Sequence, residues 1–491
     1  MPKKPRRNLS KSLFIKGMQC LKALWLTKHH PELASKKSRP WLLTEGQRVG
    51  QLAQGLFPQG KAIDRMTDAF PLRLWLTKKL IAQQHSALFE ATVQWDSITI
   101  MADILVKTDA GWELWEVKSS TSPHRSHYVL DLAVQSYVCK QAGIPIDKVK
   151  LVTLNPQYKR QGDLDLWQLF VVTDLTEEVE CKEKDVSNEI IIMRQSIQEE
   201  HMPSIGIGVQ CHSPYECEFK STCWAGVSGD SVLHLKGVSW NKKFQLLQEG
   251  IAHLADIDSH HPLYRHPQVM VHRMQEPILK RESVQAFISQ LVYPLSFLDF
   301  EAFQMAIPLF EGLVPFEQIP FEFSLHVVQE PLEEAIHTVH LEMPSDRDSR
   351  FGLAQALAHV LPPSGSILVY DSGYERIVLR QLAKLCPQYA PLFEGACDRL
   401  VDLMVPFGNY WVVHEAMHGG VSIKAILPAL FPGQHYQELA IQDGEMVRGM
   451  YDTLLHGQEP DVKHHIVEQL KDYCQMDTLA MVKILAYLKT L

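Results

Sequence analysis

The spacing of apolar residues predicts a run of strands in the first half of the chain. Apolar and polar positions alternate in three runs, at 87–95, 98–107 and 112–118, which indicates a β-meander with a hairpin turn between the last two. A helical pattern follows at 127–140 and another apolar strand at 149–155. Upstream, helical spacing predicts two helices, over residues 10–28 and 41–57.

A second series of strands begins near residue 293. Apolar runs predict strands in the segments 293–303, 321–328, 337–342 and 366–371, with a helix at 346–360, another from 374, a short one at 420–430 and a long amphipathic one from about 461. The stretch between the two series is polar and favours helix. We expect its histidines to be solvated or partly buried, because they lack the i, i+4 spacing of a ligand pair: His253, His260, His261, His266 and His272.

Composition limits the class of protein. A chain of 491 residues with 46% hydrophobic and 21% charged residues is typical of a globular protein with more than one domain. No apolar run is long enough to cross a membrane, and nothing resembles a secretory signal, so nine cysteines indicate a reducing, cytoplasmic setting. The net charge of −9 does not indicate a nucleic-acid partner, although basic residues can still line one groove.

Four cysteines form the most distinctive pattern. Cys211, Cys217 and Cys223 are spaced C-x₅-C-x₅-C, and Cys20 lies far upstream. Four thiolates suit zinc or an iron-sulfur cluster, but zinc sites usually use two close C-x-x-C pairs, so zinc is the less favoured alternative. Ordinary buried thiols are the remaining interpretation, and we assign it to the other five: Cys139, Cys181, Cys386, Cys397 and Cys474.

Three charged residues interrupt the meander where buried strands would be apolar. Glu116 and Lys118 are two apart and so share a face, and Asp103 on the neighbouring strand can meet them. Two carboxylates and an ammonium suit a divalent cation that activates water against a phosphodiester. A cross-strand salt bridge on an exposed sheet is the alternative. Glu45 is either a surface carboxylate or another ligand.

Asp103, the Glu116-Val-Lys118 run and a helix carrying Gln135, bracketed by Cys20 and the cysteine triplet, resemble the iron-sulfur RecB-like branch of the PD-(D/E)XK nucleases. The resemblance covers about residues 10–225. It implies Asp103 and Glu116 as Mg²⁺ or Mn²⁺ ligands, Lys118 as the catalytic lysine, Gln135 as a supporting residue and a [4Fe-4S] cluster on the four cysteines. The family's helix often reads Gln-x-x-x-Tyr, whereas Tyr137 here follows Gln135 by two.

Acidic residues also recur in the second series. Asp299 and Glu301 share a strand face, Glu375 lies early in a helix, and Tyr473 and Asp477 share a face of the last helix. Carboxylates brought together in this way would repel one another unless cations neutralised them, and two Mg²⁺ or Mn²⁺ ions would do so. Unrelated surface acids are the alternative.

These contexts resemble the tyrosine subclass of DnaQ-like DEDD exonucleases, which have an RNase H-like fold. Asp299-Phe-Glu301 matches D-x-E, Asp371-Ser-Gly-Tyr-Glu375 matches N-x-x-(F/Y)-D with two substitutions, and Tyr473-x-x-x-Asp477 matches Y-x-x-x-D. The resemblance covers about residues 291–491. It implies metal ligands at Asp299, Glu301, Glu375 and Asp477, a water-orienting Tyr473 and 3′→5′ polarity. Asp371 is an alternative to Glu375 as the second-motif ligand.

The sequence thus predicts an α/β chain with four parts: a disordered basic tail (1–9), a PD-(D/E)XK nuclease domain with an Fe–S cluster (10–225), a helical connector (226–290) and an RNase H-like exonuclease domain (291–491). The whole resembles a bacterial protein family that joins the two modules. We expect a metal-dependent nuclease that acts on DNA with a free end, in repair, processing or defence, with no membrane partner. A nucleic-acid-binding scaffold with one or no active site, and an RNA-processing exonuclease, are the alternatives.

Overall fold

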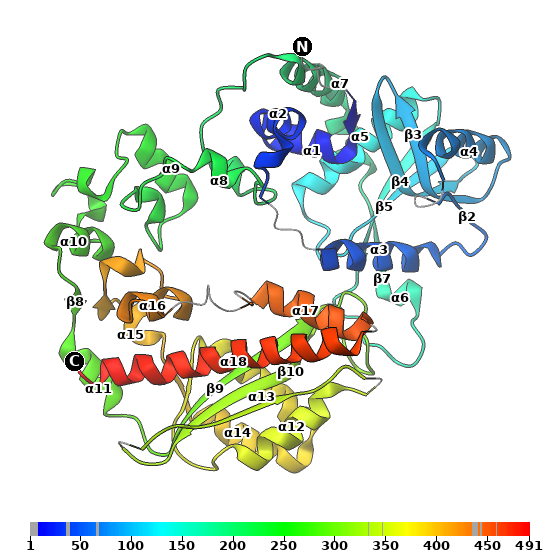
Figure 1. Ribbon diagram of the computed structural model, residues 1–491. Helices are drawn as coiled ribbons and strands as arrows, with labels where there is room; N and C mark the ends of the chain where they lie inside the picture. The colour runs from blue at the N-terminus through cyan, green and yellow to red at the C-terminus, as the bar shows by residue number, and fades with distance from the viewer. Residues whose placement is uncertain are drawn as a thin grey trace. The chain divides into compact units, whose positions relative to one another are not determined.

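The structure is a computed structural model that describes residues 8–35, 40–64, 68–331, 333–345, 347–434, 440–441, 444–457 and 459–491 (Figure 1). It is a mixed α/β protein that divides into two compact units. Unit 1 contains residues 1–226 and 305–317, and unit 2 contains residues 227–304 and 318–491. The expected basic tail at residues 3–7 lies outside the described residues. No helix in the described ranges is long and apolar enough to cross a membrane.

Unit 1 is built on a seven-stranded mixed sheet with the order β2-β3-β4-β5-β6-β7, in which β1 pairs with β4. β3, β4 and β5 form an antiparallel meander, and β6 lies parallel to β5. The strands are β1 Leu9–Ser10, β2 Lys61–Ala62, β3 Ala87–Trp95, β4 Ile98–Lys107, β5 Trp112–Val117, β6 Ile146–Leu154 and β7 Phe170–Asp174. Leu9 was expected in the disordered tail, but it is buried and pairs with Ile98.

The sheet of unit 1 packs against helices through its apolar positions. In β4, Ile98, Ile100, Ala102 and Leu105 pack in one core cluster, whereas Ile104 packs in another, so the alternation changes face near Asp103. α5 packs against β3, β4 and β6 and against α7. The helices of this unit are α1 Lys11–Gln19, α2 Leu21–His29, α3 Pro40–Gln54, α4 Phe70–Ala82, α5 Ser126–Gln141, α6 Leu166–Leu169, α7 Thr176–Gln198 and α8 Lys220–Cys223.

The helix expected over residues 10–28 is in fact two helices that meet at Cys20. The backbone of Cys20 is extended, with φ −164° and ψ 117°, so it ends α1 and begins α2. One helix ends and the next begins at this residue, and no glycine or proline at the break marks it in the sequence. Its consequence is that Cys20 lies at a junction and not within a helix.

Unit 2 contains a five-stranded sheet in the order β11-β10-β9-β12-β13. β9, β10 and β11 are antiparallel neighbours, and β12 runs parallel to both β9 and β13. The strands are β9 Leu295–Gln304, β10 Gln318–Val328, β11 Ile336–Leu341, β12 Ile367–Val369 and β13 Leu400–Asp402; a separate ribbon pairs β8 Ile278–Leu279 with β14 Val412–Val413.

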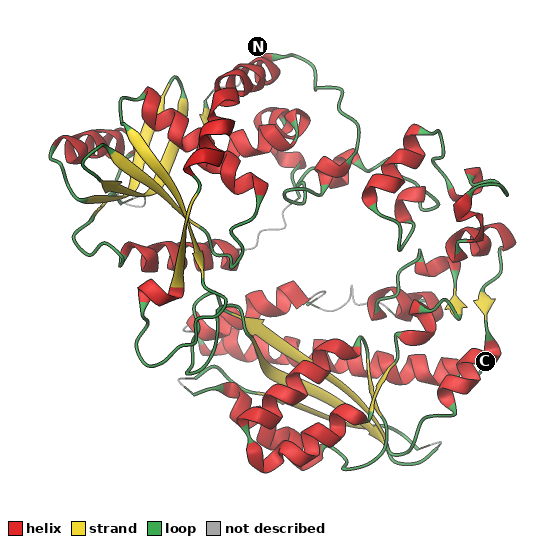
Figure 2. Ribbon diagram, turned by 180° about the vertical axis from the view of Figure 1, so that it is seen from behind, coloured by secondary structure: helices red, strands yellow, loops and turns green. Residues whose placement is uncertain are grey.

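Helices cover the five-stranded sheet in unit 2 (Figure 2). α12 packs on β10, and α13 packs on β9 and β13, while the long α18 packs on β9, β10 and β11. The helices are α9 Trp240–Gln248, α10 Pro267–Met274, α11 Arg281–Ile288, α12 Ser349–Val360, α13 Ser372–Leu385, α14 Ala390–Asp398, α15 Val405–Gly408, α16 Ile423–Leu430, α17 Gly444–His456 and α18 Pro460–Leu488. The stretch from 227 to 290 has its own small apolar cluster around Leu246 and Val269.

Candidate metal and nucleic-acid sites

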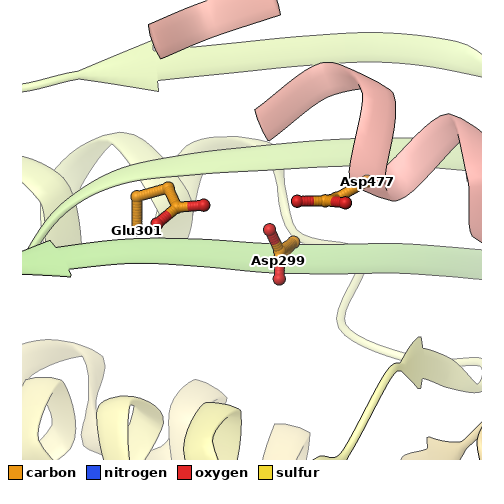
Figure 3. Close-up of side chains that lie close together, drawn as sticks. All are labelled: Asp299, Glu301 and Asp477. Atoms are coloured by element: carbon orange, nitrogen blue, oxygen red, sulfur yellow. The ribbon is translucent and has the colours of Figure 1, made fainter. Parts of the chain in front are cut away.

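The carboxylates of Asp299, Glu301 and Asp477 come together in unit 2 (Figure 3). Asp299 and Glu301 are two residues apart on β9 and so share one face, and Asp477 approaches that face from α18. One oxygen of each side chain lies within 4.8 Å of the others. Oxygen-only ligands at this spacing suit a hard divalent cation such as Mg²⁺ or Mn²⁺. We call these three residues the acidic triad.

The carboxyl groups of the acidic triad repel one another. Burial, together with repulsion from Asp477, Glu301, Glu375 and Glu322, holds the pKa of Asp299 well above its ordinary value. Burial and Asp477 also raise the pKa of Glu301 to about 8, against a smaller opposing effect of Lys424. Carboxylates resist ionisation in this way where no cation compensates them. A bound cation would remove that repulsion.

Glu375 lies near the triad but outside its group of close oxygens. It is buried at the start of α13, one of its oxygens lacks a hydrogen-bond partner among the described residues, and burial, followed by Asp371 and Asp402, raises its pKa to about 8. Asp371 is exposed, in the left-handed region with φ 69°. Asp402 stabilises the turn that leads from β12 into α13, because its carboxylate accepts hydrogen bonds from the backbone N–H groups of Asp371 and Ser372, each at 3.1 Å.

Two further residues of α18 border the triad. The Tyr473 hydroxyl accepts a hydrogen bond from the Lys424 ammonium, and burial with the neighbouring carboxylates raises the pKa of this phenol. Cys474, which the sequence analysis assigned to the ordinary buried thiols, is buried and places its Sγ 3.8 Å from Asp299 Oδ2. Burial raises the pKa of the thiol, so it stays neutral beside the carboxylates.

In unit 1, the structure gathers Asp103, Glu116, Lys118 and Gln135. Lys118 Nζ lies 2.6 Å from Glu116 Oε1, and Gln135 Nε2 donates to Glu116 Oε2 at 2.8 Å. Asp103 Oδ2 accepts a 2.8 Å hydrogen bond from the backbone N–H of Val117. Burial, then repulsion from Glu116, raises the pKa of Asp103 to about 7. The four residues come from β4, the end of β5 and α5.

Two residues that the sequence analysis did not select complete this cluster. Lys11 is at the start of α1, and its Nζ donates to Glu116 Oε1 at 2.8 Å and lies 3.5 Å from Asp131 Oδ1. Asp131 also forms an ion pair with Lys118, in which Oδ2 lies 2.5 Å from Nζ. Asp131 precedes Gln135 by one helical turn, so the i, i+4 spacing could have pointed to it. No such signal marks Lys11.

The lysines neutralise the acids of unit 1. Burial opposes the charge on Lys118, but Glu116 and Asp131 outweigh that effect and raise its pKa. Burial likewise disfavours the Glu116 carboxylate, but Lys11 and Lys118 reverse the balance and lower its pKa. Unlike the acidic triad, in which the carboxyl groups repel one another, this site is therefore close to charge balance.

Glu45 lies elsewhere in unit 1. Its buried carboxylate accepts a 2.7 Å hydrogen bond from the backbone N–H of Ala306, in agreement with the assignment of residues 305–317 to this unit.

The four predicted cluster ligands line one small cavity in unit 1: Cys20, Cys211, Cys217 and Cys223. Burial raises the pKa values of the Cys217 and Cys223 thiols. A tetrahedral zinc ion with Zn–S bonds of about 2.3 Å holds its sulfurs roughly 3.8 Å apart. Among the described residues, no three of these Sγ atoms lie within 4.8 Å of one another. Four thiols around one cavity can hold a metal ion or an iron-sulfur cluster.

Residues 296–422 match a family model described as "Domain of unknown function (DUF2779)". The matched stretch includes Asp299, Glu301 and Glu375 and ends before α18, which supplies Asp477. No curated protein and no solved structure matches the chain.

Proposed function

We propose that the protein is a metal-dependent nuclease with two phosphodiester-cleaving sites, and that DNA with a free end is its substrate. The observation that carries the proposal is the acidic triad, because three carboxylates whose oxygens lie within 4.8 Å of one another suit a divalent cation. A cation bound there would neutralise phosphate charge and lower the pKa of an attacking water.

The fold of unit 2 supports the same proposal. Its sheet order, with β9 at the centre, β10 antiparallel to it and β12 parallel on the other side, is the order expected for an RNase H-like exonuclease. In such enzymes the first strand supplies two acids and the last helix supplies another, as β9 and α18 do here. Tyr473, beside this group, has a neutral phenol that can donate a hydrogen bond to the attacking water.

Unit 1 supplies the second proposed site. Lys118 remains protonated beside Glu116, so it is suited to stabilise negative charge on a scissile phosphate and not to act as a base. Asp103 and Glu116 would hold a cation, for which Lys11 would first have to release Glu116. The four cysteines would hold a [4Fe-4S] cluster that joins the α1–α2 junction to the 211–223 segment and stabilises the domain. These two activities would serve in DNA repair, DNA processing or defence.

Cleavage by single-site variants tests the proposal. Wild-type protein, Lys118→Ala and Asp299→Ala are incubated with 3′- or 5′-labelled single- and double-stranded DNA and with RNA of the same sequence, in Mg²⁺, Mn²⁺ or EDTA. We expect metal-dependent cleavage, loss of 3′→5′ degradation in Asp299→Ala and loss of a separate activity in Lys118→Ala. Glu330→Ala, an exposed carboxylate of unit 2, is the control. Binding without cleavage would favour the scaffold, and RNA-only cleavage would favour the RNA exonuclease.

A further inference from the structure

A β-bulge in β10 places an additional carboxylate next to the acidic triad. From Gln318 to Pro320 the strand pairs with β9 in one register, but from Glu322 onward the register is shifted by one residue, so that Glu322 lies opposite Glu301. An unbroken register would have placed Phe321 there. A one-residue shift moves every following side chain to the other face of the strand. Glu322 therefore shares the face of Glu301.

The environment of Glu322 leaves its carboxyl group without a protein partner. Its side chain is 0% exposed, and neither carboxyl oxygen has a hydrogen-bond partner among the described residues. Like charges directly opposite across two antiparallel strands repel each other. Burial without hydrogen bonds disfavours a carboxylate further, so such a group calls for an explanation such as a bound ion.

The positive charge nearest to Glu322 is engaged elsewhere. Lys471 acts on the pKa of Glu322, but its ammonium lies 3.2 Å from Glu468 on the outer side of α18. The other close group from α18 is Cys474, whose thiol is buried and neutral and whose pKa is affected by both Glu322 and Asp299. Among the described residues, no ammonium or guanidinium group is hydrogen-bonded to Glu322.

We propose that Glu322 is a further ligand of the metal centre and that, with Glu301, it holds an inner divalent cation beside the acidic triad. The inference rests on the proposed metal-dependent function of unit 2. Oxygen donors from Glu301 and Glu322 suit Mg²⁺ or Mn²⁺. The β-bulge supplies the extra donor, because it places the Glu322 carboxylate opposite Glu301, where an unbroken register would place the ring of Phe321.

Counting bound Mn²⁺ tests the inference. Free Mn²⁺ is measured by electron paramagnetic resonance during titration of the full chain as wild type, Glu322→Gln, Glu322→Asp, Asp299→Asn and Glu330→Gln. Relative to wild type, we expect about one fewer Mn²⁺ per chain in Glu322→Gln, as for loss of one ion of a two-metal site. Glu322→Asp should keep the stoichiometry with roughly tenfold weaker affinity for that ion. Glu330→Gln, which removes an exposed charge from the same unit, should match wild type.

The outcomes separate this inference from the proposed function. If Glu322→Gln, or Glu322→Asp where the glutamine variant does not fold, binds Mn²⁺ with wild-type stoichiometry and affinity while Asp299→Asn loses binding, the inference is wrong and the triad site stands. If Asp299→Asn also binds as wild type does, the proposed metal site of unit 2 fails as well. Any sites in unit 1 contribute equally to every variant, so only differences between variants count.

Discussion

Lys11 Nζ lies 2.8 Å from Glu116 Oε1, although 105 positions separate the two residues. This ion pair joins the start of α1 to the end of β5 and places a second ammonium beside Lys118. The acids of unit 1 are thereby held beside two ammonium groups, whereas in unit 2 Asp477 raises the pKa values of Asp299 and Glu301. The two candidate sites should consequently respond in different ways to the loss of a charged side chain and to added cations.

Substitution Lys11→Met should destabilise unit 1. Lys118 would be the remaining lysine beside Glu116 and Asp131, and removing one member of a buried ion pair typically costs about 3–5 kcal/mol, here reduced to roughly 2–4 because Lys118 remains. Urea unfolding measures the loss, and added Mg²⁺ should restore more stability in Lys11→Met than in wild type. Lys61→Met, at an exposed position of β2, is the control. Equal stability of Lys11→Met and wild type would show that Lys11 does not balance the site.

Iron content and visible absorption test the four-cysteine site. Protein purified without oxygen should be brown and contain about four irons per chain. Cys217→Ser should lose the colour and the iron, because Cys217 lines the shared cavity, while Cys181→Ala, an exposed cysteine on α7, should keep both. A colourless protein with one zinc per chain would contradict the cluster assignment, and a metal-free protein would make all four cysteines ordinary thiols.

Removing the Tyr473 hydroxyl should lower turnover without weakening substrate binding. If the phenol orients the attacking water, Tyr473→Phe should reduce kcat about 10²-fold with KM nearly unchanged. Tyr451→Phe provides a matched control, since Tyr451 is also buried in unit 2 but stacks on Phe303 and packs against Phe321. A wild-type kcat in Tyr473→Phe would exclude a role for the hydroxyl in the reaction, and a fall in both tyrosine variants would indicate a general packing defect.

The buried imidazole of His326 should make unit 2 sensitive to acid. Burial, then the neighbouring His337, lowers the pKa of His326 to about 4, and its Nδ1 lies 2.8 Å from the Thr478 hydroxyl. The unfolded chain then binds a proton near pH 6.5 that the folded chain does not. This group's contribution therefore reduces stability as pH falls from about 6.5 to about 4, by roughly 1–2 kcal/mol once solvent screening is allowed for.

Unfolding of wild type and His326→Gln at pH 7 and pH 5 measures that contribution. The difference in stability between the two pH values should be smaller in His326→Gln, because glutamine does not titrate, whereas His359→Gln, at an exposed position, should leave it unchanged. A steeper pH dependence in His326→Gln would contradict the depressed pKa.

Local patterns in the sequence account for most of the sheets and for the paired acids. The alternation in 98–107 predicts β4 with its observed bounds, and the two-residue spacings place Glu116 with Lys118 and Asp299 with Glu301. The i, i+4 relation on the last helix likewise keeps Tyr473 and Asp477 together. These relations depend on strand and helix periodicity, which can be read from a single sequence.

The parts that escaped prediction depend on tertiary packing. The contact of Lys11 with Glu116 arises only when α1 packs near the end of β5. The opposition of Glu322 to Glu301 depends on a bulge directly after Pro320, and a proline in a strand is compatible with a bulge without fixing which residue then lies opposite Glu301. The helix break at Cys20 is of the same kind, since neither proline nor glycine causes it. Sequence periodicity therefore identified the acids on the central strands and Lys118, but not Lys11, Asp131 or Glu322.

Calorimetric titration of Mn²⁺ into wild type and Asp299→Asn tests the central claim most directly, namely that the acidic triad binds a divalent cation. Asp299→Asn keeps the shape of the side chain and removes one of the three close carboxylates, so it should abolish a binding event that wild type shows. Glu330→Gln should bind as wild type does. Identical titration curves for wild type and Asp299→Asn, or no binding by either, would contradict the claim.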